Sequence, residues 1–164
     1  MRPWCKAGAL AMCLFLAVGC AERPGETFAE LKTAALERDA DTIWQHIDPA
    51  TRETLAVEAS GYFETTPPAG GATALEGSGR DALEYLSGLV AGLGEFELEY
   101  IRSLGIREVV VDGDVATLTL RSLRARPPAR PLIFKKVEGR WLWDAREVLE
   151  MYHEHRRGGS YGGF

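Results

Sequence analysis

Residues 107–120 read REVVVDGDVATLTL, and this stretch decides the fold. The Asp112-Gly113 pair in its middle is typical of a tight hairpin turn, because both residue types accept positive backbone φ angles. Beyond the turn every second residue is apolar: Ala116, Leu118 and Leu120. A period of two indicates a strand with one buried face, so the stretch predicts a β-hairpin with strands at 107–111 and 114–120.

A second hairpin is expected further on, with strands at 132–137 and 140–145 and a turn at Glu138-Gly139. Before the first hairpin, residues 96–100 alternate apolar side chains with glutamates, and this alternation predicts one more strand. The sequence therefore predicts an antiparallel sheet of four to five strands. Within it, we expect Trp141 to be buried against a layer of helices.

Upstream of the strands, apolar residues recur at helical spacing. Residues 27–30 (TFAE) fit a capping box at the start of one helix, Asp39 or Asp41 is a candidate cap for the next, and Asp48-Pro49 begins a third over about 50–63. A fourth helix is expected over 81–93 and a short last one from Arg146. Helices followed by strands predict an α+β fold, with N-terminal helices packed on a curved antiparallel sheet.

This order of elements, with the VDGDVATLTL hairpin and the KVEGRWLW strand pair, resembles the NTF2-like superfamily over roughly residues 27–145. The resemblance implies a cone-shaped sheet bent around helices, often with a pocket between them. A cystatin-like arrangement of helices on a sheet is the nearest alternative. The superfamily includes isomerases, dehydratases and noncatalytic binding domains, and no catalytic residue can be carried over by position.

The N-terminal segment has the parts of an export signal. Arg2 and Lys6 precede the uncharged run AGALAMCLFLAVG, which is too short to span a bilayer, and Gly19 stands directly before Cys20. This junction resembles the lipobox of bacterial lipoproteins, with Ala17 where the usual pattern has leucine. The resemblance implies cleavage before Cys20 and acylation of that cysteine, which binds the protein to membrane lipid. An ordinary secretory signal is the alternative.

Cysteine usage favours lipidation. Cys5 and Cys13 lie in the signal, so Cys20 is the only thiol expected after cleavage and has no partner for an internal disulfide. We expect a signal peptide at 1–19, a lipidated tether at 20–26, one domain at 27–157, and a Gly-rich tail at 158–164. Ala21, rather than aspartate, follows Cys20, which favours the outer membrane over the inner membrane of the cell envelope.

The charge balance argues against nucleic acid as a partner. The chain of 164 residues has a formal net charge of −5, and loss of Arg2 and Lys6 with the signal makes the remainder more acidic. The charges are unevenly placed: residues 121–140 carry seven basic side chains and one acidic one. This basic segment would meet lipid headgroups or an acidic protein, or it would complement the acidic helices within the molecule.

Aromatic side chains on the predicted helices and strands are candidates for an apolar pocket, since rings offer large contact areas. The candidates are Trp44, Tyr62, Tyr85, Tyr100 and Trp143. The same placement suits core residues equally, so both interpretations stay open.

Histidines offer two further hypotheses. In the first, His46 is a general base and Asp48 is the carboxylate that orients it. Residues two apart do not share a helical face, which disfavours this pair. A surface histidine at the end of a helix is the alternative. His153 and His155 would form half of a metal site, with a solvated C-terminal segment as the alternative.

The sequence lacks a P-loop, a dinucleotide fingerprint, a Gly-x-Ser-x-Gly and a His-Glu-x-x-His motif. We therefore expect no cofactor, no metal and no catalytic activity. The sequence predicts a lipid-anchored cell-envelope protein with a noncatalytic domain that binds a small apolar ligand or another envelope protein. The alternative is an isomerase or dehydratase that uses an NTF2-like pocket.

Overall fold

A computed structural model describes residues 22–65, 78–122 and 130–157. Cys20, most of the expected loop at 65–79, most of the connector between the hairpins and the Gly-rich tail lie outside the described residues. The described elements are, in chain order, α2 Pro24–Glu37, α3 Ala40–His46, α4 Pro49–Thr65, α5 Ser78–Ala91, α6 Glu95–Ser103, β1 Leu104–Asp112, β2 Val115–Ser122, β3 Leu132–Val137, β4 Arg140–Asp144 and α7 Arg146–Arg157. Across the described ranges, no helix is both long enough and apolar enough to traverse a bilayer.

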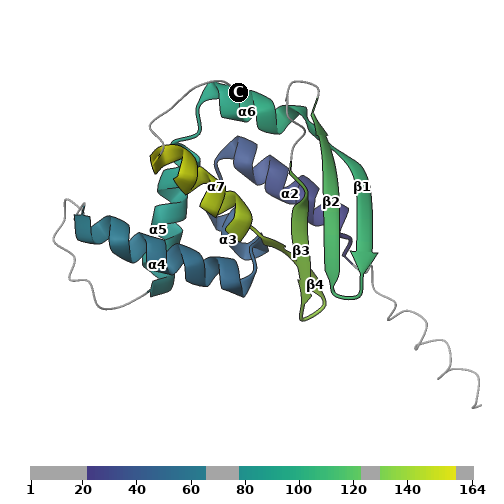
Figure 1. The fold of residues 1–164 in the computed structure, drawn as a ribbon, viewed down its shortest axis with the longest axis horizontal. Helices are drawn as coiled ribbons and strands as arrows, with labels where there is room; N and C mark the ends of the chain where they lie inside the picture. Colours follow the sequence, from purple (N-terminus) through teal and green to yellow (C-terminus); the bar gives the residue numbers. More distant parts are fainter. Residues whose placement is uncertain (1–21, 66–77, 123–129, 158–164) are drawn as a thin grey trace, which may run out of the picture.

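The strands form one antiparallel sheet in the order β1-β2-β3-β4, and the helices gather on one side of it (Figure 1). The predicted α+β class is confirmed. The sheet is not strongly curled in this view, so the cone expected from the NTF2-like resemblance is not confirmed (Figure 1).

Both predicted hairpins are present. The turn between β1 and β2 lies at Gly113-Asp114, one residue beyond the expected pair, with Gly113 at φ 59°. Glu138 and Gly139 join β3 to β4 with φ angles of 52° and 85°, and two positive values in succession match the twist of hairpin strands.

The strand predicted over 96–100 is wrong. These residues belong to α6, where Gly94 N–H donates to the Glu97 carboxylate at 3.0 Å and closes the first turn. The alternation of Phe96 and Leu98 with glutamates fitted a strand, but glutamate favours helices and only Leu98 is buried, with Phe96 63% exposed. The apolar contact of this segment therefore has helical spacing, through Leu98 and Ile101.

The first helix begins earlier than predicted. α2 starts at Pro24, inside the segment expected as a tether, and Glu26 rather than Glu30 accepts the capping hydrogen bond, from Arg23 N–H at 3.1 Å. Proline suits this position because backbone N–H groups in the first turn of a helix have no acceptor within the helix, so a residue without an N–H loses no hydrogen bond. Thr27 is thus a fully buried helical residue.

Two of the predicted caps are confirmed. Asp39 accepts from Thr42 N–H at 3.0 Å at the start of α3, and Asp48 accepts from Thr51 N–H at 2.8 Å at the start of α4. Between the two, Ile47 forms a bridge to Trp143 of β4, and Asp48 N–H donates to the Trp143 carbonyl at 3.0 Å. The junction of α3 and α4 is therefore fixed to the last strand of the sheet.

The core lies between the sheet and the helices. Ala116, Leu118 and Leu120 of β2 are buried as the period of two predicted, beside Phe134 of β3. Trp141 is 5% exposed, which confirms the expected burial of this side chain.

Candidate functional site

A cavity of about 390 Å³ lies among the helices at the inner face of the sheet. Leu31 and Ala35 of α2, Leu86 and Val90 of α5, and Leu149 of α7 are among the residues that line it. Its volume falls within the range of roughly 300–1,000 Å³ typical of small-molecule sites. Leu86 and Val90 of α5 are thus buried core residues that also border this cavity.

Two long-range hydrogen bonds help to keep the cavity walls in place. Thr51 of α4 accepts from Ala145 N–H at 3.0 Å, which holds the start of α7 against α4. Lys32 of α2 donates from Nζ to the Leu104 carbonyl at 2.6 Å, which ties α2 to the start of β1. These contacts join segments 94 and 72 residues apart, so tertiary structure rather than local sequence builds the site.

The cavity lining has few polar groups, and the charged side chains among its described residues are both positive. Lys32 and Arg130 line it, and among the described residues its lining contains no aspartate, glutamate or histidine. Arg130 also forms an ion pair with Glu147 at 2.9 Å, in which both side chains are about 60% exposed. Tyr100 and Tyr152 add phenol groups, and burial raises the pKa of Tyr100, so this phenol stays neutral.

Trp143 brings a further donor to the wall. Its indole Nε1 is buried and meets no acceptor in the described part of the chain. A buried donor without a partner costs free energy, because it has lost water and gained nothing in exchange. Such a group is commonly satisfied by a ligand or an ordered water molecule.

The five predicted pocket residues divide into two sets. Tyr100 and Trp143 line the cavity. Trp44 is not among its lining residues and lies under the Arg52 guanidinium, 5.2 Å from the ring centroid. Tyr62 and Tyr85 are likewise not in the lining and pack against each other between α4 and α5, with ring centroids 5.5 Å apart.

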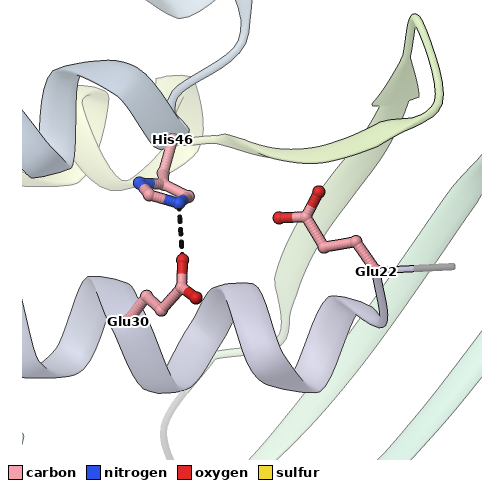
Figure 2. Close-up of side chains that lie close together, drawn as sticks. All are labelled: Glu22, Glu30 and His46. Carbon is pink, nitrogen blue, oxygen red and sulfur yellow. Dashed lines mark ion pairs between the residues drawn. The ribbon is translucent and has the colours of Figure 1, made fainter. Parts of the chain in front are cut away.

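His46 and Asp48 do not form the hypothetical catalytic pair. His46 is buried at 7% exposure, not a surface residue, and its Nε2 lies 2.7 Å from Glu30 (Figure 2). Its Nδ1 donates to the Thr42 carbonyl at 2.8 Å. Asp48 is occupied elsewhere, by the α4 cap and by Lys135 at 3.6 Å.

Glu22 completes a group of three potential metal ligands with Glu30 and His46, whose ligand atoms all lie within 4.8 Å of one another (Figure 2). The observed contacts account for the group without an ion. His46 and Glu30 form an ion pair, while Glu22 accepts from the Thr27 hydroxyl at 3.2 Å and lies 3.9 Å from Arg140. These contacts join the N-terminus of α2 to α3 and β4.

Of the two histidines in the hypothetical half metal site, the structure describes the side chain of His153 only. His153 lies 2.9 Å from Glu58 of α4, which places it in a contact between α7 and α4. The side chain of His155 lies outside the described residues.

The basic segment is partly neutralised within the molecule. Lys135 lies 2.8 Å from Asp144, and Arg140 faces Glu22. Arg146 donates to both oxygens of Asp144 at 2.8 and 2.7 Å, and together with Lys135 it holds the pKa of that carboxyl well below its usual range. These pairs favour intramolecular charge complementation over a free basic surface.

Comparison with known proteins adds no relative. No protein-family model matches the chain, no curated protein matches it, and no solved structure matches its fold. The class of protein is therefore defined by the structure alone: an α+β domain with an apolar cavity between its helices and its sheet.

Sequence reasoning missed most of the cavity, including Lys32, Arg130 and the wall from α7. One signal was available for α7: Val148, Leu149 and Tyr152 are spaced as one helical face, and all three line the cavity. No comparable signal marks Lys32, because a lysine beside an apolar stripe is the usual flank of an amphipathic helix.

Proposed function

We propose that this protein is a lipid-anchored cell-envelope protein whose domain binds a small apolar molecule without transforming it. The observation that carries the proposal is the cavity of about 390 Å³, whose lining is aliphatic and aromatic apart from a few polar groups. Apolar ligands gain about 25 cal/mol per Å² of surface removed from water, so such a cavity favours them.

The anchor in this proposal is Cys20, acylated and in contact with membrane lipid in the outer membrane, with the domain in the periplasm. In the sequence Cys20 stands four residues before Pro24, the first residue of α2, and this short separation supports a domain held close to the bilayer. A ligand released from the membrane would thus meet the cavity at high local concentration. An envelope protein as the partner is the alternative that the sequence left open.

We propose the NTF2-like plan as the finer description of the fold. Its support is the order of helices and hairpins and a cavity between helices and sheet, which the superfamily often has. The weak curl of the sheet is the feature that agrees least with it.

A noncatalytic role agrees better with the lining than an isomerase or dehydratase role does. Those reactions move a proton, and a carboxylate or an imidazole is the usual base. Among the described lining residues the ionisable groups are lysine, arginine and tyrosine only. An enzyme that uses a carboxylate or imidazole base would need to take it from another part of the chain.

A cavity-filling substitution tests the proposal. Ala35 lines the cavity on α2, and Ala35→Trp should fill it, whereas Ala29→Trp places the same side chain on an exposed position of the same helix. We expect the wild type and Ala29→Trp to bind the neutral fluorescent probe N-phenylnaphthylamine, and Ala35→Trp to lose at least about tenfold in affinity while melting no lower. Equal binding by all three proteins would show that the cavity is not the site.

A further inference from the structure

The two cations of the cavity lie at the same end of the sheet. Lys32 contacts Leu104, the first residue of β1, and Arg130 stands two residues before Leu132, the first residue of β3. Because β1, β2 and β3 alternate in direction, the starts of β1 and β3 share one end. Leu104 and Leu132 are themselves lining residues, so this end of the sheet borders the cavity.

Lys32 has unused binding capacity. Its ammonium group has three donors, and the Leu104 carbonyl takes one of them. In the described ranges it meets no carboxylate, although the protein as a whole is acidic. A partly buried cation without an anionic partner is costly, and an anion from outside the chain would remove that cost.

Trp143 provides an independent observation at the same cavity. Its buried indole N–H has no acceptor among the described residues. Trp143 pairs with Phe134 and Phe134 with Ala116, which is six residues before Ser122, the partner of Leu104. This donor therefore marks a second polar point of the lining, away from the end at Leu104. Within the described ranges, the lining thus offers two cations and a neutral donor, and it holds no acidic group that would repel an anion.

Resting on the proposed function, we infer that the ligand is an amphiphile with a hydrocarbon body and one anionic head, a carboxylate or a phosphate. The hydrocarbon body occupies the space among Leu31, Leu86 and Leu149. The head lies at the end of the sheet marked by Leu104 and Leu132, where Lys32 supplies the main charge-assisted hydrogen bond. Arg130 adds a weaker contribution, because Glu147 already pairs with it.

The test compares three probes with one hydrocarbon chain and different heads: dodecanoate, dodecyl phosphate and dodecanol. Their affinities are measured by displacement of N-phenylnaphthylamine at concentrations below micelle formation. We expect wild type to bind one or both anions about tenfold more tightly than the alcohol, and the two anionic arms distinguish a carboxylate ligand from a phosphate ligand.

Variants assign the preference to its residue. Lys32→Met keeps an unbranched side chain that is only one heavy atom shorter and removes the charge, so it should bind all three probes with similar affinity. Lys136→Met is the matched control, since Lys136 is exposed and lies over Trp141 at 5.8 Å, away from the lining. Arg130→Met is the second variant, and it should weaken anion binding less than Lys32→Met does.

The outcomes separate the two proposals. Equal affinity of wild type for the anions and the alcohol would overturn the inference and leave apolar binding intact. An anion preference that persists in both Lys32→Met and Arg130→Met would also overturn it. Failure of wild type to bind N-phenylnaphthylamine or any of the three chains would instead contradict the proposed function.

Discussion

Trp141→Ala is the substitution whose cost follows most directly from the structure. The indole is 5% exposed within the main core cluster, on a strand whose neighbour carries the fully buried Phe134. Removal of a buried tryptophan side chain costs about 3–5 kcal/mol, from lost burial and from the cavity left behind. In a domain of this size that loss lowers the melting temperature by about 10–20 °C.

The measurement is urea unfolding of the chain that begins at residue 20, with Cys20→Ser as the common background. Far-UV circular dichroism is the signal, because fluorescence would itself change when a tryptophan is removed. Most domains have 5–15 kcal/mol of stability, so the variant should stay folded at 25 °C with a clearly lower urea midpoint.

Trp44→Ala is the matched control for Trp141→Ala. Trp44 is only partly buried, and its ring is covered on one side by the Arg52 guanidinium. We expect this variant to lose about 1 kcal/mol, the value of a partly exposed cation–π contact with some packing. A cost under about 1 kcal/mol for Trp141→Ala, or equal costs for the two variants, would refute the assignment of Trp141 to the core face of β4.

Three further predictions concern other parts of the molecule. Because Arg146 and Lys135 depress the pKa of Asp144, its carboxylate stabilises the fold above the unfolded-state pKa of about 3.9 and loses that effect as the pH falls through the folded-state value. Asp144→Asn should therefore lower the free energy of unfolding at neutral pH and reduce its decline in acid, and an unchanged pH profile in urea melts would contradict this. Thr51→Val leaves Ala145 N–H buried without an acceptor and should cost about 1–3 kcal/mol in the same melts, whereas Thr54→Val, which loses only a bond to a carbonyl in its own helix, should cost less. Cys20→Ser in the full chain should abolish partition into the detergent phase and labelling by a fatty-acid analogue, and an unmodified wild-type N-terminus in mass spectrometry would remove the lipoprotein assignment.

The parts of the fold that were predicted correctly depend on short-range chemistry. Glycine at the hairpin turns, aspartate at two helix starts and the period of two in β2 each act over a few residues, so the sequence displays them directly. The errors lie where two local patterns compete. In α6 the alternation of apolar residues and glutamates satisfied a strand template, while the capping contact from Gly94 to Glu97 and the helix preference of glutamate decided the outcome.

The start of α2 was missed for a related reason. Arg23 is an uncommon residue before a helix, and the TFAE motif four residues later matched the capping pattern better. The structure instead uses Pro24 in the first turn and buries Thr27, whose hydroxyl donates to Glu22. A residue that matches a cap by type is used here as a packing residue, because α2 crosses the sheet at that point.

The cavity could not be predicted from composition, because a cavity wall and a core face have the same sequence pattern. Leu86 and Val90 recur at the spacing expected of core residues, and they are both buried and in the cavity lining. Whether the apolar faces of two helices meet or leave a space depends on the distance between the helices. Tertiary contacts help to set that distance, and the hydrogen bond from Lys32 to Leu104 is one of them. The search for aromatic residues found Tyr100 and Trp143 but also residues that pack elsewhere, since ring-rich pockets and ring-rich cores look alike in a sequence. Charge is the more selective signal. In the part of the chain that the structure describes, the cavity wall carries two cations and no carboxylate, although the protein has more acidic than basic residues. Core packing alone does not require this arrangement.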